Sequence, residues 1–169
     1  MNQPLSPGPK ELWNRVKATH MAYHQALRDF LADGVDRVNV LRPVLRGPER
    51  SSALAVAHFL KTPERMELFP EWVFLASFSH GSVQVPRDLI ASLPRDWVLS
   101  HIEQEAEPLL RQGTYDEYRR LLELFELLDR DLTLRLARRA AAHSDSDIRE
   151  AGEDFLGKLK GRAGYSVSN

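Results

Sequence analysis

Two histidines one helical turn apart, His20 and His24, have a spacing that suits metal chelation. Neutral imidazoles are common metal ligands, and side chains four residues apart lie on the same face of a helix. The motif lacks a glutamate directly after the first histidine, and no third ligand follows at a recognisable spacing. We therefore expect His20 to fill a packing position on its helix, with His24 at the margin and no metal bound.

A second group of residues that could do chemistry surrounds a loop in the middle of the chain. It consists of His80 in that loop and of Trp97 and His101 downstream. A tryptophan beside a carboxylate such as Asp96 or Glu103 would form a pocket the size of a nucleobase. The alternative, which we favour, is that the aromatic residues belong to the core and that His80 is an ordinary loop residue.

Several enzyme classes lack their defining motifs in this sequence. There is no Cys, so disulfides, thiolate zinc sites and cysteine nucleophiles are excluded. The phosphate-binding patterns G-x-x-x-x-G-K-[ST] and G-x-G-x-x-G are absent, and so is the nucleophile motif G-x-S-x-G. We expect a non-catalytic protein without a cofactor, with an enzymatic role left as the open alternative.

Composition and charge indicate an ordinary globular protein. The 169 residues suffice for one domain with a core, and 43% of them are hydrophobic while 28% are charged. The net charge is −1, and residues 101–169 contain eleven basic and fourteen acidic side chains. This balance disfavours binding to nucleic acid, which requires cationic groups opposite the phosphates. The ratio of 18 Arg to 5 Lys suggests a GC-rich bacterial genome.

The sequence shows no sign of export or membrane insertion. Residues 1–16 contain no basic segment followed by an apolar core. No apolar run approaches the roughly 20 residues that a membrane-spanning helix needs. We therefore expect a cytoplasmic protein without membrane association.

Apolar residues at three- and four-residue intervals predict helices along most of the chain. A long first helix is expected over residues 9–32, with one buried seam. Residues 35–45 fit either a strand or a short helix that Pro43 ends or kinks. We favour the helix, because a lone strand would have no partner. The seam of the first helix consists of Trp13, Val16, His20, Tyr23, Leu27 and Phe30.

The remaining helices are expected to form three antiparallel pairs. The spacing between the pairs is irregular because residues 79–93 form an insertion. The pairs are residues 49–61 with 65–78, 95–111 with 116–128, and 130–142 with 146–159. The chain then divides into a mobile lead-in at 1–8, one helical domain at 9–160 and a flexible tail at 161–169.

The last predicted pair carries a repeat pattern. A polar turn leads into a second helix whose pattern residues are Asp145, Ile148, Arg149, Ala151, Phe155 and Leu156. This order of an acid, an Ile-Arg pair, an alanine and two apolar residues resembles the second helix of a HEAT repeat. The resemblance implies an all-α fold, namely an α-α superhelix of about three antiparallel HEAT-like pairs with a long N-terminal capping helix.

The charged residues on the predicted helices are best explained as solvent-exposed surface. Glu103, Glu105 and Glu107 alternate along one helix and should spread over different faces, which argues against a metal site. Arg135 and Arg139 belong to a basic cluster on a later helix. Both groups are expected to be solvent-exposed helix surfaces.

Stacked helical pairs display their second helices on a concave surface, and such grooves recognise other proteins by charge complementarity. We therefore predict a protein–protein interaction module or adaptor, in which the groove or the long first helix docks another protein. The sequence does not specify an oligomeric state. The alternative is a DNA-acting protein, since alkylpurine glycosylases with HEAT-like repeats use an Asp beside aromatic residues. The candidate partner-binding residues are Arg119, Glu123, Arg149, Glu153, His80, Trp97 and His101.

Overall fold

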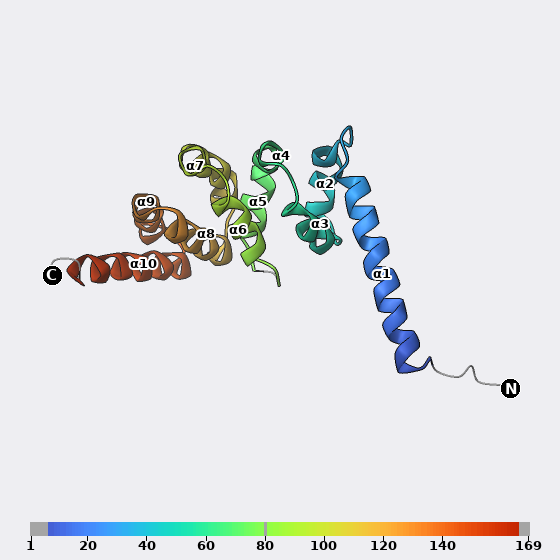
Figure 1. Cartoon of the computed structure of the whole chain (residues 1–169). Coiled ribbons are helices and arrows are strands. Elements are labelled where there is room, and N and C mark those ends of the chain that lie inside the picture. The colour runs from blue at the N-terminus through green and yellow to red at the C-terminus, as the bar shows by residue number, and fades with distance from the viewer. Residues whose placement is uncertain (1–6, 80, 166–169) are drawn as a thin grey trace.

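Every regular element in the described part of the chain is a helix. The computed structural model describes residues 7–79 and 81–165, and no helix within these ranges is long and apolar enough to cross a membrane. Figure 1 shows α2 to α10 along an elongated arrangement, with α1 leading away from it toward the N-terminus. The predicted all-α class is confirmed. The helices are α1 (Pro9–Phe30), α2 (Arg37–Arg46), α3 (Arg50–Ala57), α4 (Thr62–Glu67), α5 (Phe69–Ala76), α6 (Gln84–Ala91), α7 (Arg95–Arg111), α8 (Tyr115–Leu128), α9 (Arg130–Ala141) and α10 (Ser146–Tyr165).

Local capping residues set the helix starts in the C-terminal half. Thr114 and Glu117 form a capping box at the start of α8. The Asp129 side chain accepts hydrogen bonds from the first amides of α9, and Asp145 does the same for α10. The helix α9 packs against both α8 and α10. The predicted helices of this half are confirmed, except that α10 continues to Tyr165 instead of ending near 159.

The N-terminal half pairs its helices differently from the prediction. The segments 49–61 and 65–78 were expected to pack as one pair, but α3 packs against α2 and α6, while α5 packs against α6 and α7. Pro70 in the first turn of α5 separates that helix from the short α4. Residues 79–93, expected as an insertion with a short helix at 86–93, supply α6, which is a packing partner of α5. The helix predicted over residues 35–45 is confirmed as α2, although Pro43 lies inside this helix and does not end it.

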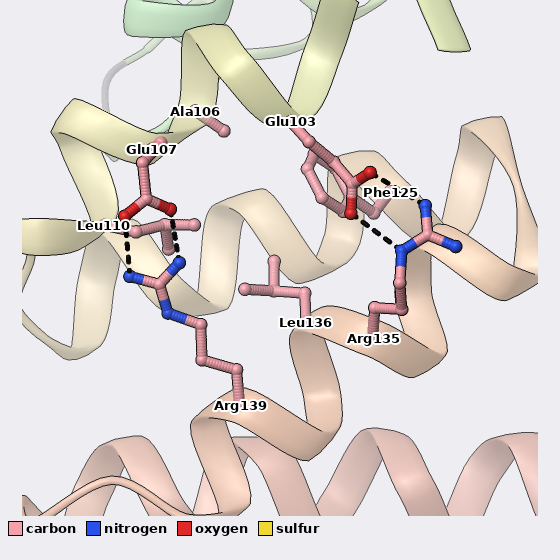
Figure 2. Close-up of a pocket in the computed structure, with 8 residues that line it drawn as sticks. All are labelled: Glu103, Ala106, Glu107, Leu110, Phe125, Arg135, Leu136 and Arg139. Carbon is pink, nitrogen blue, oxygen red and sulfur yellow. Dashed lines mark hydrogen bonds and ion pairs between the residues drawn. The ribbon is translucent and has the colours of Figure 1, made fainter. Parts of the chain in front are cut away.

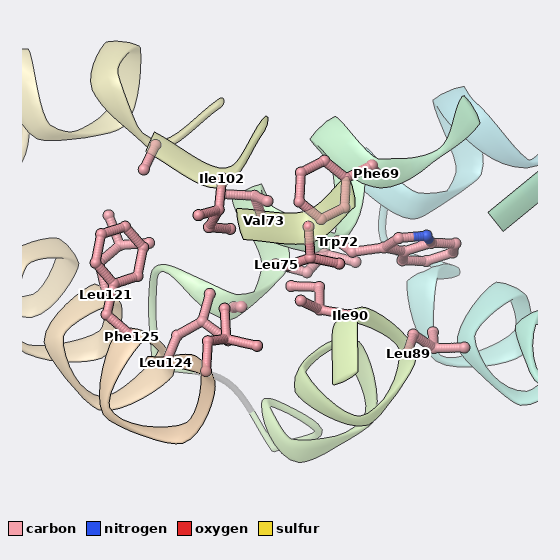
Figure 3. Packing of buried hydrophobic residues seen from close by; sticks show 14 of the residues in the cluster. Phe69, Trp72, Val73, Leu75, Leu89, Ile90, Ile102, Leu121, Leu124 and Phe125 are labelled. Carbon is pink, nitrogen blue, oxygen red and sulfur yellow. The ribbon is translucent and has the colours of Figure 1, made fainter. Parts of the chain in front are cut away.

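The core runs continuously from α2 to α10 and has α5 near its middle. Figure 3 shows Trp72 of α5 near Ile90 of α6. In the same view Ile102 of α7 lies between Phe69 of α5 and Phe125 of α8. The side chain of Trp72 is fully buried, and its indole N–H donates a hydrogen bond of 2.9 Å to the carbonyl of residue 65. The helix α5 is apolar on most faces, and such a helix is stable only when neighbours cover it on several sides. Here α6, α7 and α8 cover it.

A buried arginine fixes the C-terminal end of α1. Arg37 donates through Nε to the carboxylate of Glu64 at 2.6 Å and through Nη1 to the carbonyl of Ala32 at 2.7 Å. Gly34, whose φ of +87° is accessible mainly to glycine, allows the chain to reverse between α1 and α2. The base of α1 is therefore attached to both α2 and α4.

The seam of α1 is exposed along most of the helix. The expectation that it is buried is wrong for Trp13, Val16 and Tyr23, whose residues are 61%, 57% and 46% exposed. Leu27 is the one buried residue of α1, and Phe30 packs partly on the core. The periodic spacing identified the apolar face correctly, but no other described helix lies alongside its N-terminal part.

Candidate functional site

The first candidate site is an apolar stripe on the projecting part of α1. We define the α1 stripe as Leu12, Trp13, Val16, His20 and Tyr23, which share one face of the helix at three- and four-residue spacing. All five residues are exposed. Four of them, all except the tryptophan, line a shallow hollow that follows the helix. Contiguous apolar surface of this kind marks a site of contact with another molecule more often than ordinary solvent-exposed surface does.

The two histidines lie together on α1 without a third metal ligand. The rings of His20 and His24 meet edge to face with their centroids 4.3 Å apart, and the ring of Tyr23 approaches His24 at 5.6 Å. The expectation that His20 fills a buried packing position is wrong, since it is exposed, while His24 is half-buried. Within the described residues, no group of three or more His, Cys, Asp or Glu side chains could hold a metal ion.

The structure brings Trp97 and His101 together within α7. Their rings stack with centroids 4.3 Å apart and planes at 23°, and Phe69 meets the indole edge to face at 5.0 Å. The Nδ1 atom of His101 lies 2.8 Å from the carbonyl of Trp97 and 2.9 Å from the hydroxyl of Ser100. Both side chains are half-buried, and Trp97 packs against the core, so these contacts give no support to a nucleobase pocket. His80 lies outside the described residues.

Two of the predicted groove residues, Arg119 and Glu123, are engaged within the chain. Arg119 of α8 pairs with Asp154 of α10 at 3.2 Å. Glu123 accepts hydrogen bonds of 2.8 Å from Arg87 of α6 and from Arg120. Burial alone would raise the pKa of Glu123, but the hydrogen bonds from the two arginines outweigh it and lower the pKa below its ordinary 4.5. These contacts tie α6, α8 and α10 together.

The other two predicted groove residues differ in their roles. Arg149 donates hydrogen bonds to the carbonyls of His143 at 3.0 Å and Ser144 at 2.7 Å. It thereby satisfies carbonyl groups in the turn between α9 and α10, as cationic side chains commonly do at helix ends. Glu153 is exposed on α10. Of the four groove candidates, therefore, three hold helices or turns in place.

A small cavity between α7 and α9 is bridged by two ion pairs, which Figure 2 shows. Arg135 donates twice to Glu103, at 2.8 Å each, and Arg139 pairs with Glu107 one turn further along. Hydrogen bonds from Arg139 and Arg111 hold the pKa of Glu107 below its ordinary value. The cavity has a volume of about 110 Å³, and its apolar lining consists of Ala106, Leu110, Phe125 and Leu136.

We call the pairs Glu103–Arg135 and Glu107–Arg139 the α7–α9 clasp. The expectation that these residues lie on solvent-exposed surfaces is confirmed for Glu103, Arg135 and Arg139. The prediction did not include the pairing of each acid with a base of the other helix. The two acids are four residues apart on α7, and the two bases are four residues apart on α9. This matching i, i+4 spacing of opposite charges on two helices was a signal in the sequence that could have predicted the pairing. Since each charge in the clasp is neutralised by its partner, the clasp connects helices and offers no net charge to a ligand.

The comparisons with known proteins identify no relative. No protein-family model matches the chain, and neither a curated protein nor a solved structure matches it. Any function must therefore be argued from the surface of the molecule itself.

Proposed function

We propose that this chain is a non-catalytic protein-interaction module built from HEAT-like helical pairs, and that the α1 stripe is its docking surface. The observation that carries the proposal is the exposure of Trp13, Val16 and Tyr23 on one face of a helix. A solvated aromatic residue has no stabilising role in the isolated chain, whereas aromatic side chains are enriched at the centres of protein interfaces.

The anchoring of α1 supports the same proposal. The Arg37–Glu64 ion pair and the buried Leu27 attach the C-terminal end of the helix to the body of the molecule. A helix that is attached at one end presents its free face in a defined direction, which lowers the ordering cost of binding. The HEAT-like description is supported by the antiparallel succession α7–α8 and α9–α10 and by the repeat pattern in α10.

Site-specific photo-crosslinking in the native host tests this proposal. A photoreactive phenylalanine analogue is placed at Tyr23 on the stripe or, as the matched control, at Met21. Met21 is 68% exposed, and it lies about 140° around the helix from Val16 because successive residues are about 100° apart. We expect a specific cross-linked protein from position 23 and none from position 21.

The captured protein is then purified and its affinity is measured by calorimetry. Val16→Asp should weaken binding at least tenfold, because it places a charge in the apolar contact. Met21→Gln should bind like the wild type. Wild-type affinity in the Val16→Asp variant would show that the function does not reside in the α1 stripe.

A further inference from the structure

The cationic side chains beside the α1 stripe have no ion-pair partner within residues 7–79 and 81–161. Neither Arg15 nor Lys17 forms a salt bridge there, and Arg15 lines the same hollow as Val16. Some exposed arginines elsewhere meet a carboxylate of a neighbouring helix, as Arg135 meets Glu103, whereas others in these ranges, such as Arg138, do not. The two cations beside the stripe are therefore available to carboxylates of another molecule.

Helix geometry places these two cations on opposite borders of the stripe. At about 100° per residue, Arg15 and Lys17 project about 100° to either side of the line through Val16 and His20. In paired helices, side chains at such flanking positions reach across to the partner and select it by charge. A partner helix that packs on the stripe would therefore place the residues on one of its borders opposite Arg15 and those on its other border opposite Lys17.

A second copy of α1 is a poor occupant of this surface. In an antiparallel pair that sets Trp13 against Tyr23, the Arg15 and Lys17 side chains of both copies would lie within about 9 Å along the axis. That separation is less than one Debye length at about 0.1 M salt, so the four like charges would repel one another. A parallel pair would place Arg15 of each copy near Lys17 of the other, with the same result.

A lipid surface fits the stripe less well than a helix does. The middle of the stripe contains His20, with Thr19 lining the same hollow. Burying these polar groups among acyl chains would leave their hydrogen-bonding atoms without partners, which is costly. The side chains of a protein partner can supply such hydrogen bonds.

We propose that the α1 stripe binds an amphipathic helix of another protein that carries carboxylates on both sides of its own apolar seam. This inference rests on the proposed function and adds the chemistry of the partner. The free part of α1, from Pro9 to His24, is about 24 Å long and therefore matches a partner helix of about four turns.

Designed peptides test the charge preference with the full-length chain. One fluorescent peptide of about two heptads carries Leu at the seam positions and Glu at both flanking positions, and its twin carries Lys instead of Glu. Fluorescence anisotropy reports binding. At about 50 mM salt we expect the acidic peptide to bind at least tenfold more tightly than the basic one, with the difference shrinking as salt screens the charges.

Variants of the chain separate charge from apolar contact. The double variant Arg15→Glu with Lys17→Glu should reverse the preference, so that the basic peptide binds more tightly. Val16→Asp should lose at least tenfold in affinity for both peptides, while the uncharged change Met21→Gln, outside the stripe, should bind like the wild type. Circular dichroism of each variant confirms that the helices are retained.

Several outcomes would overturn the inference. Equal binding of the two peptides would show that the flanking cations do not select the partner. Binding of the chain to vesicles of phosphatidylcholine with phosphatidylserine, without a preference between the peptides, would assign the stripe to lipid. A dimer in sedimentation that Val16→Asp abolishes would assign it to a second copy. If the cross-linked partner binds through the stripe but shows no dependence on Arg15 and Lys17, the proposed function stands and this inference fails.

Discussion

Gly152 of α10 lies directly against the backbone of Ala141 at the end of α9. A Cβ atom added at Gly152 would stand 2.3 Å from the backbone nitrogen of Ala141 and 2.7 Å from the carbonyl oxygen of Ala137. Backbone atoms cannot move aside as a flexible side chain can. The close approach of α9 and α10 therefore depends on a residue without a side chain at this position.

The first prediction follows from this contact. Gly152→Ala should destabilise the protein by at least about 2 kcal/mol, because the two helices must separate to make room for the methyl group. Gly157→Ala on the same helix is the matched control, since no atom lies within 4 Å of its Cβ position. The control should be more stable than the wild type by about 0.5–1 kcal/mol, because alanine favours the helix. Urea unfolding followed by circular dichroism measures both, and equal stabilities would contradict the packing described.

The second prediction contrasts two aromatic residues that occupy similar positions in their helical patterns. Phe125→Ala should cost about 3–5 kcal/mol, because the side chain is buried between α7, α8 and α9. Trp13→Ala should change the free energy of unfolding by less than about 0.5 kcal/mol, because its side chain is exposed. Chemical denaturation of the two variants checks the contrast. A large loss in the tryptophan variant would mean that α1 is covered by the rest of the chain.

The third prediction concerns the anchor of α1. Arg37→Met should cost about 3 kcal/mol, because it leaves the largely buried carboxylate of Glu64 without its partner. The ion pair between Lys61 and Asp33 is exposed and serves as the control, so Lys61→Ala should cost less than about 1 kcal/mol. Hydrogen exchange should also accelerate at the C-terminal end of α1 in the Arg37 variant alone. Unchanged exchange there would show that Arg37 does not hold the helix.

The fourth prediction is a pH dependence at Glu123. Its pKa is lowered in the folded chain, so its contribution to stability is fully present above the ordinary value of 4.5 and is lost as the pH falls through the lower folded value. Glu123→Gln should therefore be less stable than the wild type at pH 7, by about 1–2 kcal/mol. The difference should shrink as the pH falls below 4.5. Urea unfolding from pH 3 to 7 measures it, and a difference that does not depend on pH would contradict the lowered pKa.

The sequence by itself determined the helices, because their signals are local. Thr114, Asp129 and Asp145 stand where amide groups at helix starts need acceptors, and the structure begins α8, α9 and α10 next to them. Pro70 likewise begins a new helix. Such signals act between residues a few positions apart, so one sequence suffices to read them. The apolar face of α1 was also identified correctly by its spacing.

Only the tertiary structure decided which apolar faces are covered and which charges are paired. Trp13 and Phe125 both follow helical periodicity, yet one is exposed and the other is buried. Periodicity defines a face but does not say whether another helix is available to cover it. In the same way, Glu103 and Arg135 are far apart in the sequence and meet because α7 and α9 come together in space. The α1 stripe is a candidate docking surface because no helix of the described chain lies along it. The apolar spacing of the sequence could not predict this absence.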